Sequence, residues 1–175
     1  SEYSLLDGAC RIEKLVDRVA ELGQTSCALT DHGVMYGVID FYRACKAKGI
    51  HPVIGCEVYL APHSRFDRSY INGEWHTHLI LLCENMTVYR NLIHMVSCVF
   101  SEGFYMKPRI DMELLRAHSE GLICLSACLA GAIPRALADG DMDGAYDLCE
   151  QFLDIFDREH FYLEIQDHGI PLQQK

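Results

Sequence analysis

The chain has 175 residues, of which 50% are hydrophobic and 23% are charged, and its formal net charge is −10. This length and composition indicate one globular domain with a buried core and exclude a disordered chain. The negative charge argues against a surface that binds nucleic acid by neutralising phosphates, and it fits a site that attracts cations. No apolar run is long enough to cross a bilayer, and no basic-then-apolar leader is present. We therefore expect no membrane partner, and if nucleic acid is bound, other domains supply most of the contact.

The nine cysteines are an odd number and include no CxxC pair. Most of them lie among apolar residues, as Cys27 and Cys83 do. Cysteines in such surroundings are typically reduced, buried thiols, so we expect a cytoplasmic protein.

Apolar residues recur at helical spacing in RIEKLVDRVAEL, and Gly23 follows in a C-cap position. In chain order the same reasoning predicts a helix over 11–22, a strand over 26–30, a helix over 36–48, strands over 51–60 and 78–83, helices over 86–100 and 111–118, a strand over 122–126, helices over 131–138 and 143–156, and a strand over 160–165. The longest irregular stretch is the loop 61–75. The alternation predicts parallel βαβ units, in a barrel or an open doubly wound sheet, and a single domain over 1–175.

Residue types that bind metals recur where the predicted strands end. In parallel α/β folds the carboxyl ends of the strands form the rim that binds ligands, so these side chains can converge there. A carboxylate, several imidazoles and a thiol suit zinc, or manganese or iron when thiolates are fewer. The set comprises the pair Asp31–His32, Glu57, His76, His78, Cys128 and the pair Asp167–His168.

Each of these residues also has a structural interpretation. His32 can lie in a turn beside a helix N-cap, and Cys128 can be a small buried apolar residue. Glu57 can point outward from an edge strand, although a carboxylate inside an apolar strand is costly unless it is paired or bound to metal. His76 and His78 share a strand face because they are two residues apart, and either can be a hydrogen-bonded structural histidine. The residues alone therefore leave the metal site open.

Seven stretches of the chain, in order, resemble the PHP (polymerase and histidinol phosphatase) domain of bacterial DNA polymerase III alpha subunits. TDHG alone would be a weak motif, but GFYMKPRID and SACLAG separate the polymerase branch from stand-alone histidinol phosphatases. The resemblance covers nearly the whole chain and implies a distorted (β/α)7 barrel with a metal cluster at the carboxyl ends of its strands. The stretches are SEYSLLDGA, ALTDHGVMYGVIDFY, GIHPVIGCEVYLAP, HLILLCEN, GFYMKPRID, LSACLAG and YLEIQDHGI.

The resemblance also implies a ligand set, in which the Glu57 position bridges two metals. It includes Asp7, which by itself is typical of a turn. The family's first motif, His-x-His, would stand directly before Ser1, and its last, Asp-x-His, would lie beyond Lys175. We therefore expect the ligand set and the barrel to be incomplete at both ends of this chain. The implied ligands are Asp7, His32, Glu57, His78 and Cys128, with His168 and His76 as secondary candidates.

The activity implied by the resemblance is phosphodiester hydrolysis at a multinuclear Zn²⁺ or Mn²⁺ cluster, or one of Fe²⁺, in the form of 3′→5′ exonuclease proofreading. Candidate phosphate contacts are Arg65, Arg68 and Lys107, although each also fits a solvated face. The parent chain would be a DNA-directed DNA polymerase (a nucleotidyltransferase) using Mg²⁺, with primer–template DNA, a sliding clamp and a proofreading subunit as partners.

Two other functions remain open from the sequence. One is a non-catalytic scaffold domain that stabilises the polymerase, and the other is a free-standing phosphomonoesterase of the histidinol-phosphatase type. The retained ligand types favour a catalytic domain over a scaffold. GFYMKPRID and SACLAG disfavour the free-standing enzyme.

Overall fold

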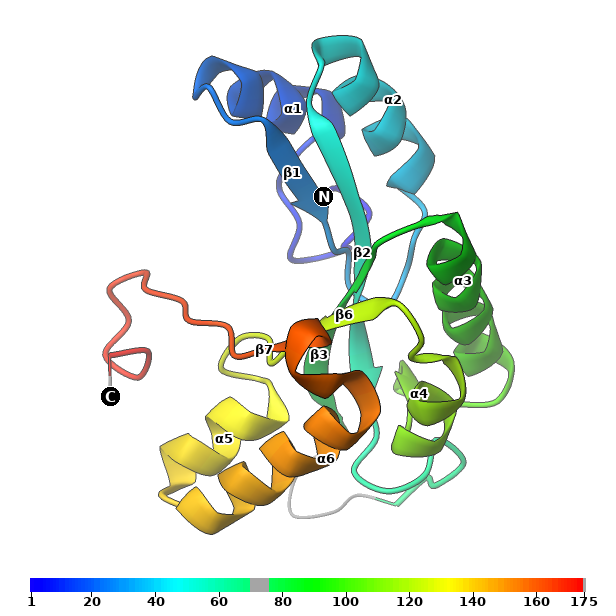
Figure 1. Cartoon of the computed structure of the whole chain (residues 1–175), viewed down its shortest axis with the longest axis vertical. Helices are drawn as coiled ribbons and strands as arrows, with labels where there is room; N and C mark the ends of the chain where they lie inside the picture. The colour runs from blue at the N-terminus through cyan, green and yellow to red at the C-terminus, as the bar shows by residue number, and fades with distance from the viewer. Residues whose placement is uncertain (70–75, 175) are drawn as a thin grey trace.

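The computed structural model describes residues 1–69 and 76–174, and within them helices surround one mixed sheet (Figure 1). The helices are α1 (Ile12–Glu21), α2 (Val38–Lys48), α3 (Met86–Ser101), α4 (Met112–His118), α5 (Ala132–Asp139) and α6 (Met142–His160). The strands are β1 (Ser26–Leu29), β2 (His51–Leu60), β3 (Thr77–Cys83), β4 (Phe104–Tyr105), β5 (Lys107–Ile110), β6 (Leu122–Leu125) and β7 (Phe161–Tyr162). All six predicted helices are confirmed, with ends that shift by a few residues.

The long strand β2 lies in the middle of the sheet and pairs with three other strands, β1, β3 and β5 (Figure 1). One edge of β2 pairs antiparallel with β3, and the other pairs parallel first with β1 and then, near its carboxyl end, with β5. The strand order is β4-β5-β2-β3-β6-β7, with β1 beside the first half of β2. The residues that follow β1 therefore lie against the second half of β2.

The expectation of parallel βαβ units was wrong at β3, which runs antiparallel to both β2 and β6. An apolar run carries no signal for strand direction, because side chains alternate in the same way in either orientation. The sequence also missed the hairpin of β4 and β5, and the strand expected over 160–165 shortens to Phe161–Tyr162. The sheet path runs from β4 to β7 without closing across the described residues, so a closed barrel is not observed.

Two apolar clusters hold the layers together. The smaller joins α1 and α2 to β1, and the larger packs α3 to α6 against the sheet. Each fully buried aliphatic or aromatic side chain contributes about 1.5–3 kcal/mol. The smaller cluster contains Ile12, Val16, Val19, Leu29, Phe41, Cys45 and Ile50.

Within the predicted loop 61–75, residues 70–75 lie outside the described residues. The described part is anchored by Arg109, a buried side chain that donates hydrogen bonds to the backbone carbonyls of Arg65 and Asp67. None of the helices in the described part of the chain is both long and apolar enough to span a membrane.

Candidate metal centre

Glu57 is the central residue of the site and is only 6% exposed. Its carboxylate contacts Nδ1 of His32 and lies 3.1 Å from Nδ1 of His78. His32 reaches it because the chain after β1 continues along β2: the Glu57 N–H donates to the Asp31 carbonyl, and the Gly33 N–H donates to the Glu57 carbonyl. The carboxylate is therefore buried and held between two imidazoles.

Cys128 joins this group from the loop after β6. Its Sγ lies 3.6 Å from His78 Nδ1 and accepts a hydrogen bond from the Ala130 N–H at 3.4 Å. The His78 N–H donates in turn to the Ala130 carbonyl, so the loop is fixed to the start of β3. One donor atom each from Glu57, His78 and Cys128 lie within 4.8 Å of one another.

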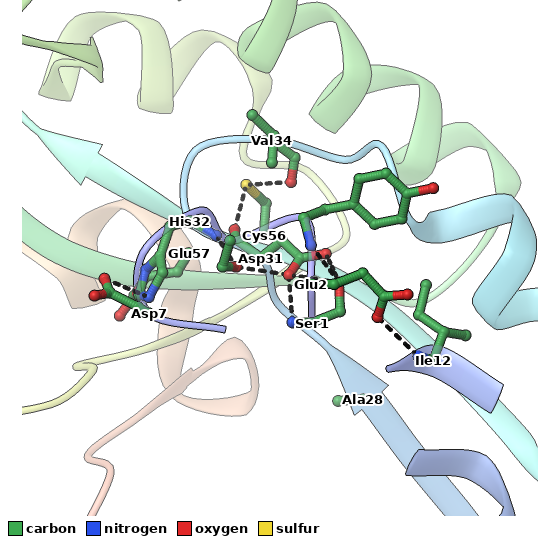
Figure 2. A network of polar contacts seen from close by, with 12 residues as sticks. Ser1, Glu2, Asp7, Ile12, Ala28, Asp31, His32, Val34, Cys56 and Glu57 are labelled. Atoms are coloured by element: carbon green, nitrogen blue, oxygen red, sulfur yellow. Dashed lines mark hydrogen bonds and ion pairs between the residues drawn. The ribbon is translucent and has the colours of Figure 1, made fainter. Parts of the chain in front are cut away.

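Asp7 is exposed and lies beside His32, with its carboxylate 3.5 Å from Nε2 of that histidine (Figure 2). The segment that carries Asp7 is held by Asp31, a buried residue that accepts hydrogen bonds from the hydroxyls of Ser1 and Ser4. The Ser4 hydroxyl also accepts the N–H of His32. Sequence reasoning gave Asp31 no separate role, although its position beside His32 at a strand end was a usable signal.

The side chains of the cluster shift one another's pKa values toward the charged forms. Burial raises the pKa of Glu57, but the contacts with His32 and His78 outweigh it and bring that pKa to about 2. Burial lowers the pKa of His78, but hydrogen bonds with Cys128 and Glu57 outweigh it and raise that pKa to about 9. The bond with His78 lowers the pKa of the Cys128 thiol against the effect of burial. A carboxylate, imidazoles and a thiol of lowered pKa are ligands that zinc-type ions prefer.

His76 lies beside this cluster. Its ring stacks on that of His78 with centroids 5.8 Å apart, and Tyr59 packs edge-on against both rings. The Nδ1 atom of His76 is buried and has no hydrogen-bond partner in the described part of the chain. Burial, together with the charge of His78, lowers the pKa of His76 to about 4, so its imidazole is neutral at physiological pH.

Sequence reasoning missed Tyr59, a buried residue that forms one wall of the site. It lies two residues after Glu57 in β2, which places both side chains on one face of the strand. The Lys107 ammonium lies 5.2 Å from the Tyr59 ring centroid. Gly33 has a φ of +67°, and a Cβ there would lie 2.8 Å from the Tyr59 ring, so a side chain at position 33 would displace the tyrosine.

Of the predicted phosphate contacts, Lys107 is exposed beside Tyr59, and Arg68 is exposed on the loop after β2. The Arg65 guanidinium forms ion pairs with Glu102 at 3.1 Å and with Asp111 at 3.0 Å. These carboxylates occupy Arg65, so of the three predicted phosphate contacts Lys107 is the one whose ammonium lies beside a residue of the site, Tyr59.

His168 is not brought to the cluster by any contact in the described residues. Its N–H donates to the side-chain oxygen of Gln173, and its Nδ1 lies 3.2 Å from the Gln173 side-chain nitrogen. Both residues belong to the C-terminal segment, which extends away from the sheet (Figure 1).

The chain is therefore an α/β domain built on a mixed sheet. A cluster of a carboxylate, imidazoles and a thiol at one end of the strands is its candidate metal site. The family model of the PHP domain matches residues 1–168, and the chain belongs to this family. This finding confirms the resemblance on which the implied ligand set rests.

Curated relatives are DNA polymerase III alpha subunits. The subunit of Treponema pallidum is 48% identical over 176 residues, covering 100% of this chain and 15% of that protein. The subunit of Chlamydia muridarum is 47% identical, covering 96% and 14% respectively, and that of Thermus aquaticus is 42% identical, covering 100% and 15%. The chain thus spans about 15% of the length of these relatives and is homologous to their N-terminal region.

Among solved structures, an amidohydrolase from Chromobacterium violaceum superposes with a TM-score of 0.43 and 20% identity. The superposition covers 88% of this chain and 47% of that chain.

Proposed function

We propose that this chain is the PHP domain of a bacterial replicative DNA polymerase III alpha subunit and hydrolyses phosphodiester bonds with bound divalent metal, as a 3′→5′ exonuclease acting on primer ends. The observation that carries the proposal is the convergence of Glu57, His78 and Cys128, from β2, β3 and the loop after β6. The relatives support the assignment to a polymerase chain.

The residues fit a metal of the Zn²⁺, Mn²⁺ or Fe²⁺ type. Glu57, His78 and Cys128 would hold it, and His32 and Asp7 would complete a multinuclear set, because both lie on the other side of the Glu57 carboxylate. Such an ion, when bound, lowers the pKa of a coordinated water and polarises a phosphoryl oxygen.

The surrounding residues have roles of their own. Glu57 stays ionised at neutral pH and orients both imidazoles through its two oxygens. Tyr59 packs edge-on against His76 and His78 and covers one side of both rings. The exposed ammonium of Lys107, beside Tyr59, would contact a phosphate of the substrate strand.

The proposal extends to the fold and to the parent protein. Further strands outside residues 1–175 would close the open sheet into the PHP-type barrel and bring in the His-x-His and Asp-x-His motifs. The parent chain would synthesise DNA with Mg²⁺ in the cytoplasm and bind primer–template DNA, a sliding clamp and a proofreading subunit.

The test measures metal content and hydrolysis in the full-length parent protein. We expect elemental analysis to find bound Zn²⁺, Mn²⁺ or Fe²⁺. We also expect the protein to shorten a single-stranded oligonucleotide, and this shortening should stop when the 3′ end of the oligonucleotide is blocked. Glu57→Gln should lower both metal content and hydrolysis. The matched control Glu84→Gln changes an exposed glutamate that also faces a histidine, and it should change neither.

The other outcomes identify the alternatives. A parent protein without metal and without hydrolysis would show the scaffold function. Turnover of a phosphomonoester without cleavage of the oligonucleotide would show a phosphatase.

A further inference from the structure

A second group of metal-binding residue types lies on α3 and α4, on elements that contribute nothing to the Glu57 cluster. His94 and Cys98 are four residues apart on α3, so they share one face of that helix. His118 is the last residue of α4, and its ring centroid lies 4.9 Å from that of His94. His94 therefore contacts Cys98 on its own helix and His118 across the contact between the two helices.

Cys98 and His94 form a hydrogen bond whose length also fits two donors of one metal ion. The Cys98 Sγ lies 3.4 Å from Nε2 of His94. In tetrahedral zinc sites the Zn–S bond is about 2.3 Å and the Zn–N bond about 2.0–2.1 Å, so a sulfur and a nitrogen on one ion lie about 3.5 Å apart. The helix thus presents two donors at coordination spacing.

His118 completes the group at a comparable spacing. Two imidazoles on one tetrahedral ion have ring centroids about 5 Å apart. The three donor atoms are not all within 4.8 Å of one another, unlike those of the Glu57 cluster, so binding requires a rotation of the imidazoles. Burial and the neighbouring charge of His94 lower the pKa of His118, which favours the neutral ring that a metal needs.

We propose that His94, Cys98 and His118 form a second metal site, which takes a borderline-soft divalent cation of the Zn²⁺ type and joins α3 to α4. One thiolate and two imidazoles suit this class of ion better than Mg²⁺ or Ca²⁺. Because His94 is exposed and Cys98 is half-buried, the fourth coordination position faces solvent. The site is independent of the proposed hydrolase function.

The experiment uses Co²⁺ as a spectroscopic probe of thiolate ligands, in the full chain carrying Cys128→Ser to remove the thiol of the first site. We expect this variant to keep a thiolate-to-cobalt charge-transfer band and to bind Zn²⁺ in competition. Adding either Cys98→Ser or His118→Gln should abolish the band or weaken Co²⁺ binding by about tenfold or more.

The matched control is Cys149→Ser in the same background, because Cys149 is another half-buried thiol on a helix, and it should leave the band unchanged. Circular dichroism establishes that each variant keeps its helices. Absence of the band in the Cys128→Ser chain would overturn the proposal. The proposal would also be overturned if the band survived Cys98→Ser, or if His118→Gln left Co²⁺ affinity unchanged.

Discussion

Replacement of Glu57 by glutamine tests whether the buried carboxylate organises the site. The variant keeps the size of the side chain and one oxygen acceptor but removes the charge between His32 and His78. In the presence of a chelator we expect it to be less stable than the original chain at neutral pH. In the presence of Zn²⁺ or Mn²⁺ the gap should widen, because a ligand is lost as well.

The size of the effect follows from the pKa of Glu57, which is about 2 in the folded chain against an ordinary value of 4.5. That difference corresponds to an upper limit of about 3–4 kcal/mol of stability at neutral pH. The side chains of His32 and His78 are 29% and 19% exposed, and solvent screening reduces the expected loss to about 1–3 kcal/mol. Because the folded pKa is lowered, this contribution is present above pH 4.5 and is lost as the pH falls through about 2.

The assay is urea denaturation at neutral pH with chelator, followed by thermal unfolding with added metal. The matched control is Glu84→Gln, since Glu84 also faces a histidine but is 44% exposed, and we expect it to cost less than about 0.5 kcal/mol. If Glu57→Gln were as stable as the control in chelator and gained as much from metal as the original chain, the carboxylate would not organise the site.

Three further changes probe the surroundings of the site. In metal-free protein the pKa of His78 is raised to about 9, which should add stability that is fully present below pH 6.5 and lost as the pH rises through about 9. Urea denaturation from pH 6 to 10 should show this loss of stability. The variant His78→Gln should lack this pH dependence. Asp111→Ala should cost about 2–4 kcal/mol in urea denaturation, because it removes the N-cap of α4 and the partner of the nearly buried Arg65. If its cost were below about 1 kcal/mol, the pair would be unimportant. Lys107→Ala should raise KM for an oligonucleotide while metal content stays the same, and an unchanged KM would exclude Lys107 from substrate binding.

Helices were the part of the fold that could be predicted from the sequence, because their signals are local. In the α2 segment the apolar spacing indicated the helix, and Gly49, in the left-handed conformation, ended it where expected. The strand His51–Leu60 was also predicted with its observed limits, since a long β-rich run has few alternatives. Most candidate ligands could be chosen because metal-binding residue types recurred where the predicted strands end, whereas Asp7 was implied only by the family resemblance.

Tertiary structure decided the direction of β3 and which side chains meet. Strand direction depends on how the chain returns after Leu60, and no pattern within Thr77–Cys83 encodes it. The pairing of Arg65 with Asp111 joins residues 46 positions apart, and the roles of Tyr59 and Asp31 likewise depend on long-range contacts. Residue types and local periodicity are written in the sequence, whereas the distances among Glu57, His78 and Cys128 exist only once β2, β3 and β6 pair.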